Sequence, residues 1–158
     1  MATASVTSDQ DVIIAEIQIA APRERVFKAL SDARELKQWF TGPECPVKFW
    51  EMDPRLDGKY RYTTERGSVV VNGVREFECH GQITEYDPPR LLAYTWLGNW
   101  HDDTTIPTVV RWELTARQHG THVKVTHSGL SKLPVARKDY SGGWSGVVEM
   151  LKKFVENN

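Results

Sequence analysis

The feature that most constrains the fold is an apolar stripe near the end of the chain. Trp144, Val148, Leu151 and Val155 are spaced by four, three and four residues, which places them on one face of a helix over residues 140–157. Charged residues such as Lys152 occupy the opposite side of that helix. A helix with so broad an apolar face needs a large concave surface to cover it, and we expect the rest of the chain to supply that surface.

The middle of the chain, residues 47–130, has the pattern of β-strands. Turn-forming pairs such as Asp57-Gly58, Asn72-Gly73 and His119-Gly120 separate the strand-like runs, which is typical of hairpins. Because no helical segment alternates with these runs, the pattern favours an antiparallel meander over a parallel sheet. The predicted strands cover residues 47–51, 59–64, 74–86, 91–97, 109–116 and 122–127.

Another strand and two helices are predicted before this meander. Apolar and polar residues alternate over 12–19, which indicates a strand. Pro22 then opens a helix, and a second short helix is capped by Ser31 or Asp32 and stopped by Gly42-Pro43. The predicted fold is therefore α+β, a curved antiparallel sheet around a long C-terminal helix. Residues 1–10, small and polar, are predicted to be a flexible N-terminus, and residues 11–158 a single domain.

The composition narrows the functional class. A net charge of −1 without a basic stripe argues against nucleic acid, and no apolar run is long enough to span a membrane. With no signal-like start, the expected location is cytoplasmic. Cys45 and Cys79 lack ligand spacing and are interpreted as reduced, buried thiols. Asp102-Asp103 could in principle bind a metal but is interpreted as ordinary surface acidity, so no metal and no cofactor are predicted.

The predicted strands carry an aromatic face. A period of two places Tyr94 and Trp96 on one face, Trp112 on the matching face of the next strand, and Gly81 among the inward residues of the long strand. These rings either fill the space beneath the helix as a closed core or line a pocket there. Gly81 indicates a sharp bend or a close approach of the helix. The candidate ligand-binding residues are Trp39, Tyr60, Tyr62, Arg75, Phe77, Tyr94, Trp96, Trp112, His127, Trp144 and Val148.

The sequence shows no standard catalytic motif. It has no nucleophile elbow, no phosphate-binding glycine loop and no HExxH, and Ser141-Gly142-Gly143-Trp144 is interpreted as a helix entry. His127 is the one candidate for proton exchange, because alternation places it inward near the end of the last strand. A core histidine bonded to the backbone is the alternative. Arg75 shares parity with Phe77, and an inward Arg75 would favour a carboxylate-bearing ligand.

The chain contains several motifs that are weak one by one but occur in a characteristic order. In that order they resemble those of the stand-alone START-like proteins of the SRPBCC superfamily and, within it, the activator of heat-shock protein 90 ATPase family. The resemblance covers about residues 12–155. It rests on Ala21-Pro22-Arg23-Glu24-Arg25-Val26-Phe27, Trp39-Phe40, Asp57-Gly58-Lys59-Tyr60, Gly81-Gln82-Ile83-Thr84-Glu85-Tyr86-Asp87-Pro88-Pro89, Thr126-His127-Ser128-Gly129-Leu130 and Gly143-Trp144. Asn99-Trp100-His101 is similar to a fragment of a motif in the activators' separate N-terminal domain, and is interpreted as coincidence because it lies in a loop between strands.

The resemblance implies a helix-grip fold whose cavity, in the wider superfamily, holds lipids, sterols, polyketides or plant hormones. Our leading hypothesis is a noncatalytic binder of a small hydrophobic, lipid-like or aromatic molecule. One alternative is an interaction module whose partner is a heat-shock chaperone, and the other is a cyclase or hydrolase that uses His127. A role in stress response is compatible with each.

Overall fold

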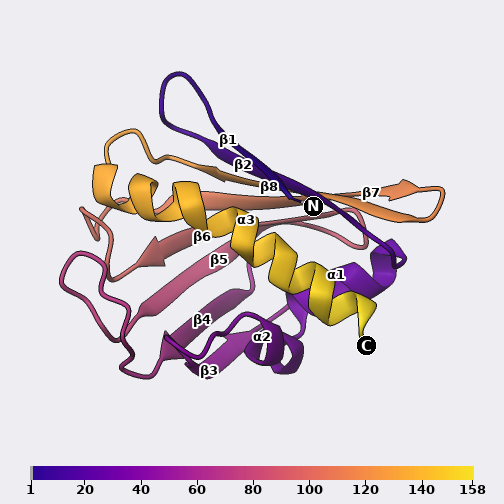
Figure 1. The fold of residues 1–158 in the computed structure, drawn as a ribbon, viewed down its shortest axis with the longest axis horizontal. Coiled ribbons are helices and arrows are strands. Elements are labelled where there is room, and N and C mark those ends of the chain that lie inside the picture. Colours follow the sequence, from indigo (N-terminus) through magenta and orange to yellow (C-terminus); the bar gives the residue numbers. More distant parts are fainter. Residues whose placement is uncertain (1) are drawn as a thin grey trace.

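The computed structural model describes residues 2–158 as one curved sheet with three helices on a single face (Figure 1). The eight strands are antiparallel to their neighbours, in the order β1-β2-β8-β7-β6-β5-β4-β3. This is the α+β helix-grip architecture expected from the sequence. The elements are β1 (Thr3–Val6), β2 (Ile13–Ile19), α1 (Arg23–Ser31), α2 (Ala33–Trp39), β3 (Val47–Met52), β4 (Lys59–Thr64), β5 (Glu78–Asp87), β6 (Leu91–Gly98), β7 (Thr108–Arg117), β8 (Gly120–Ser128) and α3 (Pro134–Glu156).

The N-terminal segment differs from the prediction. Thr3–Val6 forms an edge strand that pairs with β2, whereas a flexible terminus was expected over residues 1–10. All four of its side chains are exposed, so the strand is held through its backbone and carries no apolar alternation for a sequence pattern to reveal. The Ala2 amide also donates to Glu149 on α3 (2.8 Å). Residue 1 lies outside the described residues.

Two short helices follow β2 as predicted, and one residue joins them. Asp32 ends α1 and caps α2, because its side chain accepts hydrogen bonds from the amides of Arg34 (2.9 Å) and Glu35 (3.3 Å). Of the two candidate caps, the structure therefore selects Asp32. The apolar side of the pair packs against the sheet, where Leu36 and Trp39 are buried.

The long strand predicted from residue 74 begins only at Glu78. Val71 and Val74 pair across a tight turn in which Asn72 (φ 51°) and Gly73 (φ 77°) are left-handed, so the chain stays outside the sheet until Phe77. Because Arg75 lies outside the strand, the alternation that placed it on the same face as Phe77 does not apply. Its side chain is exposed, which corrects the expectation that it points inward.

Gly81 lies in a close contact between neighbouring strands, not in a close contact with the helix. A Cβ atom at this position would lie 1.8 Å from the Thr95 carbonyl oxygen on β6 and 2.7 Å from the Tyr60 ring on β4. The Tyr60 hydroxyl donates to the same Thr95 oxygen (2.6 Å). Only glycine leaves room for the Tyr60 side chain to cross β5 and reach β6.

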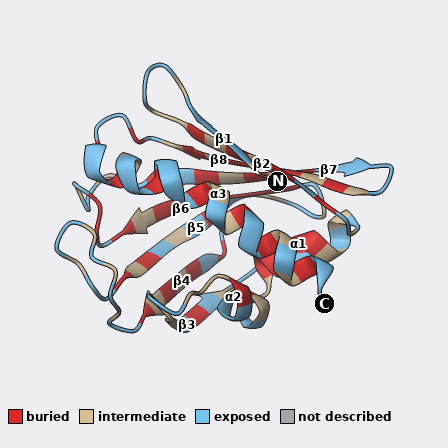
Figure 2. Cartoon of the chain, in the orientation of Figure 1, coloured by how far each residue is buried: buried red, intermediate tan, exposed pale blue. Residues whose placement is uncertain are grey.

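Helix α3 begins at Pro134, earlier than the predicted start at 140. Asp102, in the loop after β6, accepts hydrogen bonds from the amides of Val135 and Ala136 (both 3.0 Å) and so caps the helix from outside its own segment. Gly142-Gly143 consequently lies inside α3, not at its entry. Buried residues follow one stripe of α3 (Figure 2). No helix in residues 2–158 is both long and apolar enough to cross a membrane.

Candidate functional site

The inner face of the sheet divides into two regions. The first, which we call the closed half, consists of β2, β6, β7 and β8 beneath α3. Its large rings are almost fully buried, with Trp112 at 1% exposure and Trp96 and Trp144 at 2%. Trp144, Val148 and Leu151 of α3 pack onto this half as the apolar stripe requires. The closed half is a filled aromatic core.

His127 lies at the centre of a satisfied hydrogen-bond chain in the closed half. The indole of Trp144 donates to its Nδ1 (3.0 Å), and its Nε2 lies 2.7 Å from Thr108 Oγ1. Because an indole nitrogen can only donate, Nδ1 must be the acceptor and the imidazole proton must be on Nε2. Nε2 therefore donates to the Thr108 hydroxyl, which donates in turn to the Trp96 carbonyl (2.7 Å).

Burial lowers the pKa of His127 well below its ordinary value of 6.5, and the nearby His101 lowers it further. The imidazole is therefore neutral, with both nitrogens already engaged. This arrangement is the core-histidine alternative, with side-chain partners in place of the backbone. It gives no support to proton exchange with a ligand at His127.

The other indoles of the closed half are also paired. Trp112 donates to the Tyr94 hydroxyl (2.8 Å), and Trp96 donates to the Tyr140 hydroxyl (2.8 Å). Tyr140 in turn bonds His101 Nε2 (2.7 Å). If Tyr140 donates there, its oxygen remains free to accept from Trp96, and every group but His101 Nδ1 is satisfied.

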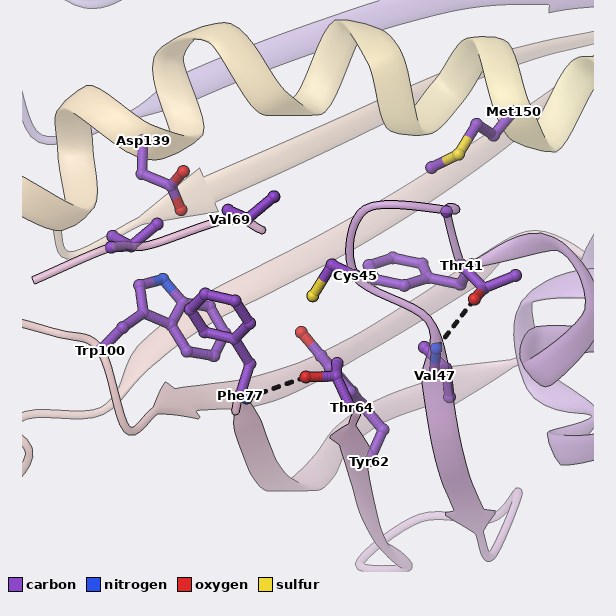
Figure 3. Close-up of a pocket in the computed structure, with 13 residues that line it drawn as sticks. Thr41, Cys45, Val47, Tyr62, Thr64, Val69, Phe77, Trp100, Asp139 and Met150 are labelled. Carbon is purple, nitrogen blue, oxygen red and sulfur yellow. Dashed lines mark hydrogen bonds between the residues drawn. The ribbon is translucent and has the colours of Figure 1, made fainter. Parts of the chain in front are cut away.

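The second region, which we call the open half, consists of β3, β4 and β5 with the loops that lie over them. It contains a pocket of about 250 Å³ that is partly open to solvent. Asp139 and Met150 reach it from α3, while Trp100, Phe77 and Tyr62 form the opposite wall (Figure 3). The lining residues are Phe40, Thr41, Gly42, Cys45, Val47, Tyr62, Thr64, Val69, Val71, Phe77, Trp100, Asp139 and Met150.

Of the eleven predicted ligand-binding residues, Tyr62 and Phe77 line this pocket. Arg75 is exposed outside it, and Trp39 is buried with its indole donating to the Ala29 carbonyl (2.8 Å). The other predicted residues are buried in the core without lining the pocket: Tyr60, Tyr94, Trp96, Trp112, His127, Trp144 and Val148.

The pocket exists because one flank of α3 has few side chains to fill it. With 3.6 residues per turn, Gly143 projects from α3 about 40° from Asp139 and about 20° from Met150, and both of those residues line the pocket. A Cβ atom at Gly143 would meet nothing within 4 Å. The neighbouring stripe of α3, through Trp144 and Val148, is filled by large side chains and closes the other half.

Two hydroxyl oxygens of the pocket wall are bonded to the backbone. Thr64 Oγ1 accepts from the Phe77 amide (2.9 Å), and Thr41 Oγ1 accepts from the Val47 amide (2.8 Å). The indole N–H of Trp100 has no hydrogen-bond partner among the described residues, although Trp100 is only 5% exposed. An unpaired buried donor of this kind costs about 1–3 kcal/mol.

Asp139 is the acidic group of the pocket. Its carboxylate points from α3 toward the Trp100 indole, whose nitrogen lies on the side of the ring that faces α3 (Figure 3). Crowding by protein atoms raises the pKa of Asp139, although the Trp100 N–H acts in the opposite direction and the residue remains exposed to solvent. The two groups influence each other but do not reach hydrogen-bonding geometry.

The two cysteines differ in how deeply they are buried. Cys79 is buried and burial raises the pKa of its thiol, whereas Cys45 is half-buried in the pocket wall, so the prediction of a buried thiol is wrong for Cys45.

The two acidic residues of the loop after β6 have structural partners. Asp102 caps α3 and Asp103 accepts from Thr105. In residues 2–158 no group of three or more His, Cys, Asp or Glu side chains is placed to hold a metal ion.

Sequence reasoning missed most of the pocket wall. The loop residues Val69 and Val71 belong to an apolar run, Val69-Val70-Val71, that lies outside every strand, and such a run is the signal that could have revealed a wall. Trp100 belongs to the triplet Asn99-Trp100-His101, which the sequence alone leads us to interpret as coincidence. In the structure this triplet joins the open half to α3, through the Trp100 ring beside Tyr140 and the His101 bond to Tyr140.

Comparison with known proteins agrees with this architecture. The family model described as "Activator of Hsp90 ATPase homolog 1-like protein" matches residues 20–156. The chain belongs to this family. No curated protein matches it in sequence.

Solved structures with this fold come from several bacteria. A protein from Arthrobacter aurescens has a TM-score of 0.79 at 16% identity, covering 99% of this chain and 92% of its own. Protein Ms6760 from Mycobacterium smegmatis has a TM-score of 0.77 at 15% identity, with 98% and 94% covered. An activator-of-Hsp90-ATPase-like protein from Aeromonas hydrophila has a TM-score of 0.72 at 20% identity, with 92% of each chain covered. At these identities the likeness shows the fold alone.

Proposed function

We propose that this chain binds a small, uncharged apolar molecule in the pocket of the open half. The observation that carries the proposal is the pocket itself, an apolar recess with an unpaired indole donor in its wall. Pockets with apolar walls and a few unmatched polar groups are the usual form of small-molecule sites. We therefore assign the ligand that we predicted between the sheet and the helix to the pocket over β3–β5, away from the aromatic core of the closed half.

The volume limits the size of the molecule. A cavity of roughly 150 Å³ accommodates benzene, and drug-sized ligands occupy about 300–1,000 Å³. A pocket of about 250 Å³ therefore suits one substituted aromatic ring or a short branched chain. Sterols and long lipids would need Met150, Val69 and Val71 to move aside.

A matched pair of helix variants tests the proposal. Gly143→Leu places a side chain on the flank that faces the pocket, whereas Gly142→Leu places the same side chain about 100° away around α3. Both positions are helical and open, so both variants are expected to fold. Calorimetric titration with ethylbenzene should give saturable binding to the wild type and Gly142→Leu, and at least about tenfold weaker binding to Gly143→Leu. Equal binding by all three proteins would contradict a site in the open half.

The family assignment supports a second candidate, contact with a chaperone ATPase, because the family's description names an activator of Hsp90 ATPase. Such contact would use the molecular surface, so Gly143→Leu should leave it unchanged. The chaperone's ATPase rate with and without this protein measures it directly, and an unchanged rate would remove this candidate.

A further inference from the structure

Two polar groups at one end of the pocket, the Trp100 indole N–H and the Asp139 carboxylate, define what a ligand placed there must offer. The Trp100 N–H can only donate a hydrogen bond, and an ionised Asp139 can only accept one. They face each other across the side of the pocket nearest the start of α3 (Figure 3). A single atom placed between them would satisfy both only if it accepts from one side and donates to the other.

We infer that the ligand of this pocket carries a hydroxyl group, as a phenol or a short apolar alcohol, whose oxygen accepts from Trp100 Nε1 and whose proton is donated to the Asp139 carboxylate. This inference rests on the proposed function, because it specifies the head group of the same ligand. The apolar body then lies against Phe77, Tyr62 and Phe40.

Other head groups fit the pair less well. A carboxylate accepts from Trp100 but is repelled by Asp139, and an ammonium group pairs with Asp139 but leaves the Trp100 N–H without an acceptor. An ether or a methyl group satisfies at most one of the two. The hydroxyl oxygens of Thr41 and Thr64 accept from backbone amides, so at these two positions, and at Tyr62, a ligand meets a hydroxyl and not the donor and acceptor pair of Trp100 and Asp139.

The size of the expected preference follows from the bonds formed. A hydrogen bond to a charged group adds about 1.5–3 kcal/mol, which corresponds to roughly a tenfold to hundredfold change in Kd. We therefore expect 4-ethylphenol to bind at least about tenfold more tightly than ethylbenzene, which has the same apolar body. We expect 4-ethylbenzoate to bind more weakly than either.

The test measures the ratio of the ethylbenzene Kd to the 4-ethylphenol Kd, in the wild type and three variants. Asp139→Ala removes the acceptor at an exposed helical position, and Trp100→Phe removes the donor while keeping a ring. Trp50→Phe is the matched control, because the Trp50 indole is also buried and unpaired but does not line the pocket. The ratio should fall toward one in the first two variants and stay unchanged in Trp50→Phe. A ratio is insensitive to changes of pocket shape that weaken both ligands alike.

The outcomes separate the two proposals. If ethylbenzene and 4-ethylphenol bind the open half equally, the hydroxyl inference is overturned while the proposed function stands, and the polar pair holds a bridging water only. If 4-ethylbenzylamine binds most tightly and Trp100→Phe has no effect, the site recognises charge and the inference is again overturned. If none of the four compounds binds, both proposals fail.

Discussion

The closed and open halves of the inner face are both rich in aromatic rings, yet they differ in how their polar atoms are paired. In the closed half Trp96, Trp112 and Trp144 each donate to a side-chain acceptor, and among the described residues only His101 Nδ1 of that network lacks a partner. In the open half Trp50 and Trp100 have no acceptor among the described residues. A satisfied network marks a core whose contents are fixed, whereas an unpaired donor beside an empty volume marks a place for something else.

The largest expected effect comes from removing a ring of the closed half. Trp144→Ala should lower the free energy of unfolding by about 3–5 kcal/mol, because it leaves a cavity and takes away the partner of His127 Nδ1. Urea denaturation measures this loss. Met150→Ala, on the pocket flank of the same helix, should cost less than about 1 kcal/mol, since Met150 is 36% exposed. Similar losses for both variants would remove the distinction between the halves.

A pH effect of intermediate size should arise from His127 and His101. Burial lowers the pKa of each in the folded protein, that of His101 to about 4, although Asp102 acts in the opposite direction on His101. The unfolded chain, with histidine pKa values near 6.5, binds more protons below that pH, so stability is lost as the pH falls from about 6.5 toward 4. Each histidine contributes a slope of about 1.4 kcal/mol per pH unit.

Urea midpoints measured from pH 7 to pH 5 test this slope. His101→Gln should reduce it by about half, whereas His80→Gln, at an exposed position, should leave it as in the wild type. A flat profile in the wild type would mean that neither imidazole is held neutral by the fold.

The smallest expected effect isolates the indole N–H groups themselves. Trp144→Phe leaves His127 Nδ1 without a donor and should cost about 1–3 kcal/mol. Trp100→Phe removes a buried donor that already lacks a partner. Because the cost of burying that donor disappears, it offsets the lost packing, and the free energy of unfolding should change by less than about 1 kcal/mol. Thermal or urea unfolding of the two variants compares them. A larger loss for Trp100→Phe would show that its indole is paired after all.

Much of this fold could be predicted from the sequence, because burial leaves a periodic trace. The stripe through Trp144 and Val148 and the strand alternation both follow from one apolar face per element. Residues 3–6 left no such trace, since that strand is bound only through its backbone. The start of α3 was hidden because its cap, Asp102, comes from a distant loop.

The site was harder to predict than the fold. Alternation correctly places Trp96, Trp112 and His127 inside, but it cannot say whether an inner ring is packed or borders a space. That depends on what lies opposite, and opposite β3–β5 the helix offers glycine at 143. The valine loop and Trp100 lie outside regular strands, where periodicity carries no information.

The most direct test of this account is a ¹H–¹⁵N spectrum of the six tryptophan indoles recorded during titration with ethylbenzene. The account predicts that the Trp100 indole peak shifts saturably while the peaks of Trp96, Trp112 and Trp144 stay in place. Saturable shifts at Trp112 and Trp144 with a stationary Trp100 peak would place the ligand in the aromatic centre and contradict the division into a closed and an open half.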